Sequence, residues 1–194
     1  MHSGNLRRVR SENKLNIEDC LKIGKQTTYA LLGSGLHARQ GMSPIIALTI
    51  WRTYVIPKLL YGIEIMTYTK TDLQKLERLQ LKILKQFQGL SERTANVGVH
   101  SLLGINPIEA VIDRNTLSFL GSIIRNKSTI KFAILERELS MSKTNGNCYA
   151  IRVSKILQKY NLLMLSVLIN NPPTKLEWKS QVKRAVHIFW ETTW

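Results

Sequence analysis

Helix start and stop signals are concentrated between residues 43 and 109, and they constrain the fold more than any other feature of this sequence. Ser43 followed by Pro44 is typical of an N-cap and a first helical residue, because a proline there leaves no N–H unsatisfied. The apolar stretch that follows contains Pro57, which removes one intrahelical hydrogen bond and clashes with the preceding turn. We therefore expect a helix from Pro44 that kinks or breaks near Pro57 and ends at Gly62.

The next segment has a strongly amphipathic pattern. Residues 71–74, Thr71-Asp72-Leu73-Gln74, have the form of a capping box that would open a helix. At about 100° per residue, one arc of this helix is apolar and contains Leu73, Leu76, Ile83, Leu84 and Phe87. The opposite arc is basic and contains Lys75, Arg78, Lys82 and Lys85. These four residues are candidate nucleic-acid-binding residues. An ordinary lysine-rich surface would give the same pattern, and the sequence leaves both readings open.

The rest of the chain also has helical rather than alternating patterns. They cover residues 17–32, 97–103, 108–126, 130–139, 149–169 and 175–192, with a hydrophilic loop expected at 140–147. Asn106 and Pro107 are predicted as N-cap and first helical residue of one helix, and Thr174 as the cap of the last. No stretch of alternating β-branched residues is bounded by turns. The sequence therefore predicts an all-α multi-helix bundle of short to medium helices, with a kinked helix near Pro57.

The last predicted helix combines lysines with aromatic residues. Lys175, Lys179 and Lys183 form a row at four-residue spacing, beside Trp178 and the Phe189-Trp190 pair. Such a face could stack bases while the lysines hold phosphates. The aromatic positions also follow the core period, which favours an amphipathic helix that packs its aromatics inside.

Several blocks in the first two thirds of the chain resemble the segment that follows the polymerase core in reverse transcriptases of non-LTR (LINE-type) retrotransposons. The blocks are Tyr29 to His37, Gly41 to Pro44, Tyr54, Pro57-Lys58-Leu59-Leu60-Tyr61-Gly62-Ile63-Glu64, Leu76-Glu77-Arg78-Leu79-Gln80, and Leu102-Leu103-Gly104-Ile105-Asn106-Pro107-Ile108-Glu109-Ala110. The resemblance implies a helical thumb and the start of a linker, which in that family grip the template-primer duplex by its backbone. It suggests a thumb-like domain with a basic N-terminal arm at 1–126 and a helical C-terminal extension at 127–194.

The catalytic part of such a polymerase is not visible in this sequence. RNA-directed DNA polymerases hold two divalent metals with carboxylates, usually including an adjacent aspartate pair. The only aspartates here are Asp19, Asp72 and Asp113, and no two are adjacent. We therefore expect no enzymatic activity, no metal site and no cofactor.

Composition and charge favour a polyanionic partner. The chain has 28 Lys and Arg against 13 Asp and Glu, a formal net charge of +15. Cys20 and Cys148 are too few for a secreted disulfide scaffold, and neither has a metal-binding spacing. The N-terminus does not read as a signal peptide, and no apolar run is long enough to span a membrane. We expect an intracellular protein, in the nucleus or cytoplasm, with no membrane and no small-molecule substrate; its oligomeric state stays open.

These observations lead to one functional expectation and one alternative. We expect a fragment that resembles a non-LTR reverse transcriptase without its catalytic palm domain. It would bind the backbone of RNA, DNA or their hybrid, independently of sequence, through Lys75, Arg78, Lys82 and Lys85. The alternative is a non-enzymatic helical interaction module, or an inert remnant of a truncated element, whose basic face only keeps it soluble.

Overall fold

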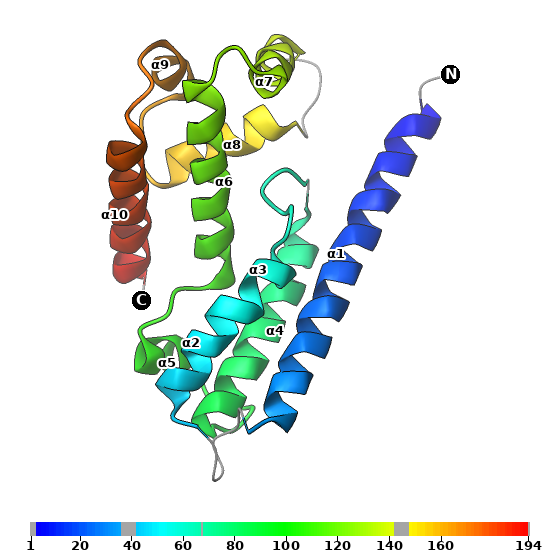
Figure 1. Cartoon of the computed structure of the whole chain (residues 1–194), viewed down its shortest axis with the longest axis vertical. Coiled ribbons are helices and arrows are strands. Elements are labelled where there is room, and N and C mark those ends of the chain that lie inside the picture. The colour runs from blue at the N-terminus through cyan, green and yellow to red at the C-terminus, as the bar shows by residue number, and fades with distance from the viewer. Residues whose placement is uncertain (1–2, 36–41, 67, 142–147, 194) are drawn as a thin grey trace. The chain divides into compact units, whose positions relative to one another are not determined.

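The computed structural model describes residues 3–35, 42–66, 68–141 and 148–193, with only the backbone described for 3–15. Within these ranges it contains ten helices and no strand, so the predicted all-α fold is confirmed (Figure 1). The helices are α1 (Ser3–Gly33), α2 (Pro44–Tyr54), α3 (Ile56–Leu59), α4 (Lys70–Gln88), α5 (Asn96–Leu103), α6 (Ile108–Arg125), α7 (Ile130–Met141), α8 (Tyr149–Lys159), α9 (Leu165–Asn170) and α10 (Lys175–Thr193). The blocks at residues 29–37 and 41–44 and the predicted loop at 140–147 lie partly outside the described residues.

The chain divides into two compact units. Unit 1 comprises Met1–Ile63 and Tyr68–Glu109, and unit 2 comprises Glu64–Thr67 and Ala110–Trp194. The main boundary thus falls at the start of α6, between Glu109 and Ala110. The sequence had suggested a boundary after residue 126. The reason is that Leu120 and Ile124 on α6 belong to the same apolar cluster as Val153 and Trp178 from later helices.

Unit 1 is built from α1 to α5. Figure 1 shows three rods side by side: α1, the α2–α3 pair, and α4. Helix α4 contacts α1, α2 and α5. The expected break near Pro57 is confirmed at Val55, between α2 and α3. The amide of Val55 still bonds the carbonyl of Trp51 at 2.9 Å, and the ladder resumes with Leu59 bonding Val55 at 2.8 Å. Because Trp51, Val55 and Leu59 are all buried, the break bends the chain without interrupting its apolar face.

Helix α4 begins two residues earlier than the sequence suggested, so the cap predicted at Thr71 is wrong. The N-cap is Thr69, and the capping box pairs it with Asp72. The hydroxyl of Thr69 accepts from the Asp72 amide at 3.2 Å, and the Asp72 carboxylate accepts from the Thr69 amide at 3.1 Å and its hydroxyl at 2.7 Å. The predicted box would have paired Thr71 with the amide of Gln74. A carboxylate is a stronger hydrogen-bond acceptor than an amide, which explains why the helix begins with the Thr69–Asp72 box instead.

This cap gives a pH-dependent stability prediction. Burial acts to raise the pKa of Asp72, but the hydrogen bonds with Thr69 and the charge of Lys75 outweigh it, so the net pKa lies below its usual value. The cap's contribution should therefore be complete above the unfolded pKa of about 4 and be lost as pH falls through the folded pKa. Asp72→Asn should lower the free energy of unfolding by about 1 kcal/mol at neutral pH.

Urea unfolding at several pH values measures this effect. The difference between wild type and Asp72→Asn should shrink as pH falls below about 4. Asp19→Asn is the matched control, since Asp19 is exposed on α1 and should change stability by less than about 0.5 kcal/mol. A difference that stays constant down to acid pH would contradict the assigned cap.

The C-terminal end of α4 is closed by glycine, and its buried face is wider than the predicted arc. Gly89 has φ 64°, in the left-handed region, and the amide of Leu90 bonds the carbonyl of Lys85 at 2.9 Å. Of the predicted core residues, Leu73 is only half-buried, whereas Leu79 and Gln80 are buried as well. The face is wider because α4 contacts helices on more than one side.

Gln80 joins α4 to the start of α6. Its side-chain oxygen accepts from the Ile108 amide at 2.7 Å, and its Nε2 donates to the Asn106 carbonyl at 3.2 Å. Helix α6 begins at Ile108, so Asn106 and Pro107 precede it and the predicted cap at Asn106 is wrong. The first amide of α6 is satisfied by a side chain 28 residues away instead of by a local one.

Unit 2 packs α6 to α10 around one apolar cluster. The helical pattern at 149–169 forms two helices, α8 and α9, and the segment between them contains Asn161, which has φ 52°. Helix α10 begins as predicted after Thr174, whose hydroxyl accepts from the Glu177 amide at 3.3 Å while the Glu177 carboxylate accepts from the Thr174 amide at 3.1 Å. Trp178 then lies buried against α6, where Gly121 leaves room for the indole.

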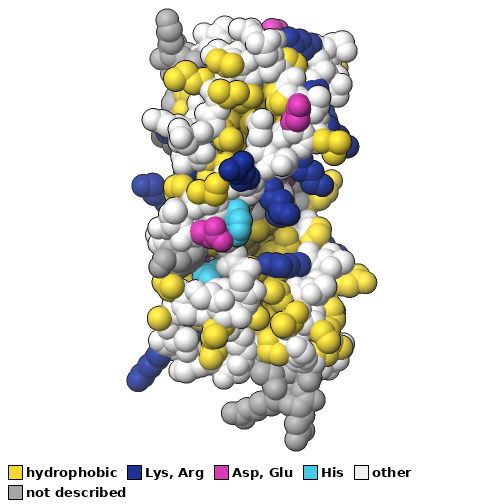
Figure 2. Space-filling view, turned by 90° about the vertical axis from the view of Figure 1, so that its left-hand side faces the viewer, with side chains coloured by type: hydrophobic (Ala, Val, Ile, Leu, Met, Phe, Trp, Pro, Cys, Tyr) yellow, Lys and Arg dark blue, Asp and Glu magenta, His cyan; other side chains and the backbone are white. Residues whose placement is uncertain are grey.

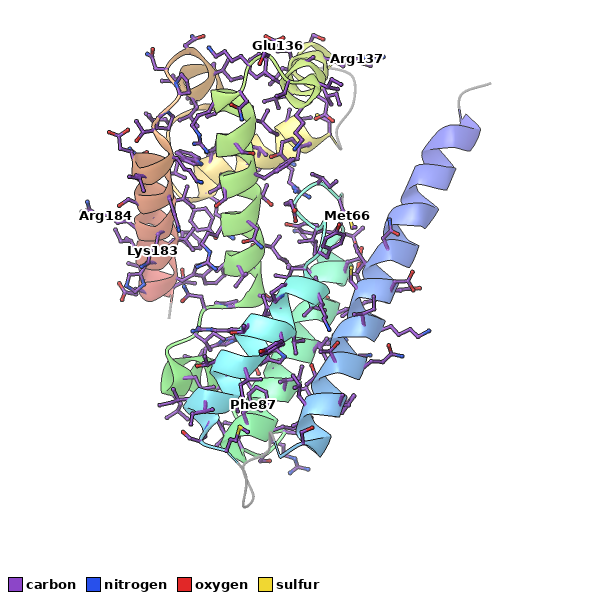
Figure 3. The ribbon with its side chains drawn as sticks, in the orientation of Figure 1. Met66, Phe87, Glu136, Arg137, Lys183 and Arg184 are labelled. Atoms are coloured by element: carbon purple, nitrogen blue, oxygen red, sulfur yellow. The ribbon has the colours of Figure 1, made fainter. Side chains whose placement is uncertain are left out.

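The short segment before α4 belongs to unit 2 because Arg152 holds it. The guanidinium of Arg152, on α8, donates to the backbone carbonyls of Glu64 and Met66 and to the Thr116 hydroxyl on α6. Figure 3 labels Met66 in this loop. Of the helices described here, none combines the length and the apolar character needed to cross a membrane.

Candidate nucleic-acid interface

Helix α4 places the four predicted residues on its outer side, in different environments. Arg78 and Lys82 are exposed, whereas Lys75 and Lys85 are half-buried. The capping box and the Gly89 turn hold both ends of the helix, and Phe87 and its neighbours anchor the opposite face in the core (Figure 3). The basic side chains are thus presented by a rigid element.

Lys75 is engaged by two carboxylates. Its Nζ lies 3.9 Å from Glu18 on α1 and 3.7 Å from Asp72 in the α4 cap. With 41% of the Lys75 side chain and 48% of the Glu18 side chain exposed, the pair with Glu18 is screened and of small energy. They nevertheless offset the charge of Lys75, so this end of the basic face is less positive than the sequence suggested. Glu18 could not be recognised as its partner from the sequence, because the contact depends on how α1 packs on α4.

The other three residues gather around a shallow hollow. Arg78, Lys82 and Lys85 line a depression of about 320 Å³ at the C-terminal half of α4, together with Glu92 from the following loop. Lys85 Nζ donates to the backbone carbonyl of Glu92 at 2.7 Å, which fixes the position of its ammonium group. Spacings of four and three residues place the three cations along about 10 Å of one helix face. The structure therefore brings Arg78, Lys82 and Lys85 together and sets Lys75 apart.

Such an arrangement suits contact with phosphate oxygens. Arginine and lysine donate charge-assisted hydrogen bonds to phosphate, and those contacts position a duplex without reading its bases. No group of three His, Cys, Asp or Glu side chains that could hold a metal ion occurs in the described parts of the chain. The three aspartates have separate places, since Asp19 is exposed on α1, Asp72 is part of the α4 cap, and Asp113 pairs with Lys159 in unit 2.

The base-stacking reading of α10 is not supported. Trp178 and Trp190 are buried, with their indole N–H groups donating to the Leu117 carbonyl at 2.8 Å and to the Tyr160 hydroxyl at 3.2 Å. Phe189 packs edge-on against Tyr160, with ring centroids 5.2 Å apart. The aromatic residues belong to the core of unit 2, and the lysines of the row are left exposed without a stacking platform.

Comparison of the chain with family models, with curated proteins and with solved structures finds no match.

Proposed function

We propose that this chain binds the sugar-phosphate backbone of RNA, DNA or their hybrid, independently of base sequence, through the basic face of α4. The observation that supports this most directly is the grouping of Arg78, Lys82 and Lys85 around one hollow on a helix with both ends capped. The net charge of +15 supplies long-range attraction to the same class of partner. The proposal extends the resemblance to the thumb of non-LTR reverse transcriptases, and it assigns this chain a binding role without nucleotide transfer.

The salt dependence of binding tests the number of phosphate contacts. Three neutralised phosphates predict a slope of about −2.7 in a plot of log binding constant against log salt concentration for a B-form duplex. Affinity should then fall about fortyfold between about 50 and 200 mM salt. A slope nearer −3.6 would mean that Lys75 leaves its carboxylates and contacts a fourth phosphate. Fluorescence anisotropy with labelled duplexes of unrelated sequence gives these values.

A triple variant tests whether the position of the charges matters. Changing Arg78, Lys82 and Lys85 to Gln keeps helix propensity and the apolar face, and it should lower duplex affinity at least about tenfold at low salt. The matched control changes Lys175, Lys179 and Lys183 to Gln, an equal number of exposed charges in a row on α10. The control should cost much less. Equal losses in the two variants would mean that only net charge acts, which would favour the interaction-module or remnant alternative.

A further inference from the structure

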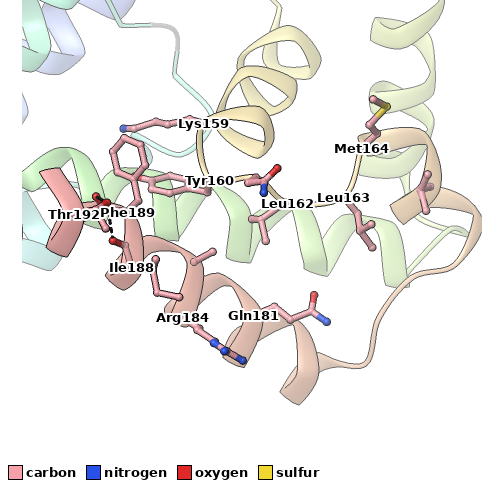
Figure 4. A pocket seen from close by; sticks show the side chains of 13 residues that line it. Lys159, Tyr160, Leu162, Leu163, Met164, Gln181, Arg184, Ile188, Phe189 and Thr192 are labelled. Carbon is pink, nitrogen blue, oxygen red and sulfur yellow. Dashed lines mark hydrogen bonds between the residues drawn. The ribbon is translucent and has the colours of Figure 1, made fainter.

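A second hollow lies within unit 2, between α10 and the segment that joins α8 to α9. It is an open groove of about 880 Å³. Figure 4 shows side chains of the 160s segment facing α10 across this space, with Leu162 and Leu163 on one side and Gln181, Arg184 and Ile188 on the other. None of the residues of the α4 face lines it.

The groove gathers exposed apolar side chains. Among its lining residues, Leu163 is 57% exposed, Met164 76%, Val167 43% and Ile188 49%. Single exposed apolar residues are ordinary, but several that converge on one hollow mark a binding surface. Figure 2 shows hydrophobic side chains exposed beside lysine and arginine side chains on the face that it draws. The methionine side chain suits such a surface because it adapts to a partner's shape.

The wall formed by α10 has the length of a short helix. Its lining residues Gln181, Arg184, Ile188 and Thr192 follow one another at three- and four-residue spacing, so they form one face of α10. From Gln181 to Thr192, eleven helical steps of about 1.5 Å make this wall about 16 Å long, or about three turns. A groove of this length between two walls is the geometry in which an amphipathic helix buries its apolar face.

The floor of the groove is held by a hydrogen-bonded network. Lys159 Nζ and the Tyr160 hydroxyl each lie 2.8 Å from Oδ2 of Asp113, and the indole of Trp190 donates to the same hydroxyl. The Lys159 ammonium also lies about 5 Å from the ring centroids of Tyr160 and Trp190. These contacts join α6, α8 and α10 and hold Lys159 and Tyr160, which line the groove, in place.

The charge of the groove selects its occupant. Arg184 supplies the positive charge of the lining, since the Lys159 ammonium is paired with Asp113, and the described lining contains no carboxylate. Lys183 precedes Arg184 on α10 and adds positive charge beside the groove (Figure 3). An acidic partner is therefore attracted and a basic one repelled. A second copy of this chain, with a net charge of +15, is disfavoured for the same reason.

We infer that this groove binds an amphipathic helix of an acidic partner protein. The bound helix places leucine-like side chains, spaced i, i+3 or i+4 and i+7, against Met164, Val167 and Ile188, and it turns carboxylates towards Arg184. This inference concerns unit 2 and does not rest on nucleic-acid binding by α4.

A designed peptide provides the first test. The probe is a fluorescein-labelled helical peptide of about five turns, with leucine at the stated spacing and glutamate on both flanks. Fluorescence anisotropy with the full chain should show binding at least about tenfold tighter than binding of a scrambled peptide of equal composition, because only the first forms an apolar face. Equal binding of the two peptides, or no binding of either, would overturn the inference. The α4 triple variant should bind the probe as wild type does, which separates the two proposals.

Paired variants on α10 give the second test. Ile188→Ser should lower the affinity for the peptide probe about tenfold. Leu176→Ser, which changes an exposed residue outside the groove, should leave that affinity unchanged. Arg184→Glu should weaken binding more than Lys183→Glu, because only Arg184 lines the groove. All four residues are exposed, so the helical circular dichroism should be retained. Equal effects within either pair would contradict the assignment.

Two further measurements test other occupants. Sedimentation equilibrium should show the same oligomeric state for wild type and Ile188→Ser. Vesicles of phosphatidylserine and phosphatidylcholine should likewise bind the two proteins to the same extent. A dimer sensitive to Ile188 would assign the groove to a second copy of the chain, and sensitive vesicle binding would assign it to lipid. Either result would replace the proposed helical partner.

Discussion

Replacing Trp178 with alanine should lower the free energy of unfolding of unit 2 by about 3–5 kcal/mol. The indole is 2% exposed and belongs to the apolar cluster shared by α6, α8 and α10. Its removal leaves a cavity beside Gly121, where no Cβ is present to fill the space. It also removes the 2.8 Å hydrogen bond that the indole N–H donates to the Leu117 carbonyl.

Chemical unfolding followed by far-ultraviolet circular dichroism measures the change. Leu176→Ala on the same helix is the matched control, because Leu176 is 81% exposed and its replacement should cost less than about 0.5 kcal/mol. A loss of less than about 1 kcal/mol in Trp178→Ala would be inconsistent with an indole that fills the core.

Removing Asp113 should cost about 3–5 kcal/mol, because it leaves the ammonium group of Lys159 without its carboxylate. The Asp113 side chain is 4% exposed and that of Lys159 is 23% exposed, with 2.8 Å between Oδ2 and Nζ. The Tyr160 hydroxyl would lose its acceptor at the same time. Urea unfolding of Asp113→Ala at neutral pH should therefore show a large decrease in the midpoint.

A double variant separates the lost pair from lost packing. Asp113→Leu combined with Lys159→Met replaces both charges with apolar side chains of similar size, and such replacements are often neutral or stabilising. The double variant should be at least about 2 kcal/mol more stable than Asp113→Ala. If it is as unstable as Asp113→Ala, the contribution of Asp113 does not come from its charge pair. Because this network forms the floor of the groove beside α10, Asp113→Ala should also weaken peptide binding there.

The basic face of α4 shows how far sequence periodicity can reach. The spacing of about 100° per residue correctly separated the basic residues from the apolar ones on α4. The apolar residues Leu76, Ile83, Leu84 and Phe87 are buried, whereas the basic residues Lys75, Arg78, Lys82 and Lys85 are not. Whether each cation is available depends on neighbours that periodicity does not describe. Lys75 meets Glu18 from α1, and Lys85 meets the backbone of Glu92 beyond the end of the helix. Their different environments therefore follow from packing and loop geometry.

Sequence periodicity could not predict the domain boundary or the burial of polar residues either. Gln80 lies in a helical pattern like any other polar residue, and only its 2.7 Å contact with the Ile108 amide explains its burial. Arg152 likewise holds the carbonyls of Glu64 and Met66, more than 80 residues earlier in the chain. No local rule links such positions, because their contacts form only after the helices have packed.

Local sequence determined the fold class and several helix ends. Pro44 and Thr174 start helices, Pro57 causes the break at Val55, and Gly89 and Gly104 end helices in left-handed conformations. These features depend on contacts between residues at most a few positions apart, and residue type sets them directly. The tertiary structure alone decided which cations stay available, which aromatics enter the core and where the groove beside α10 opens. Those outcomes depend on residues that are distant in the chain, whose approach is set by the packing of whole helices.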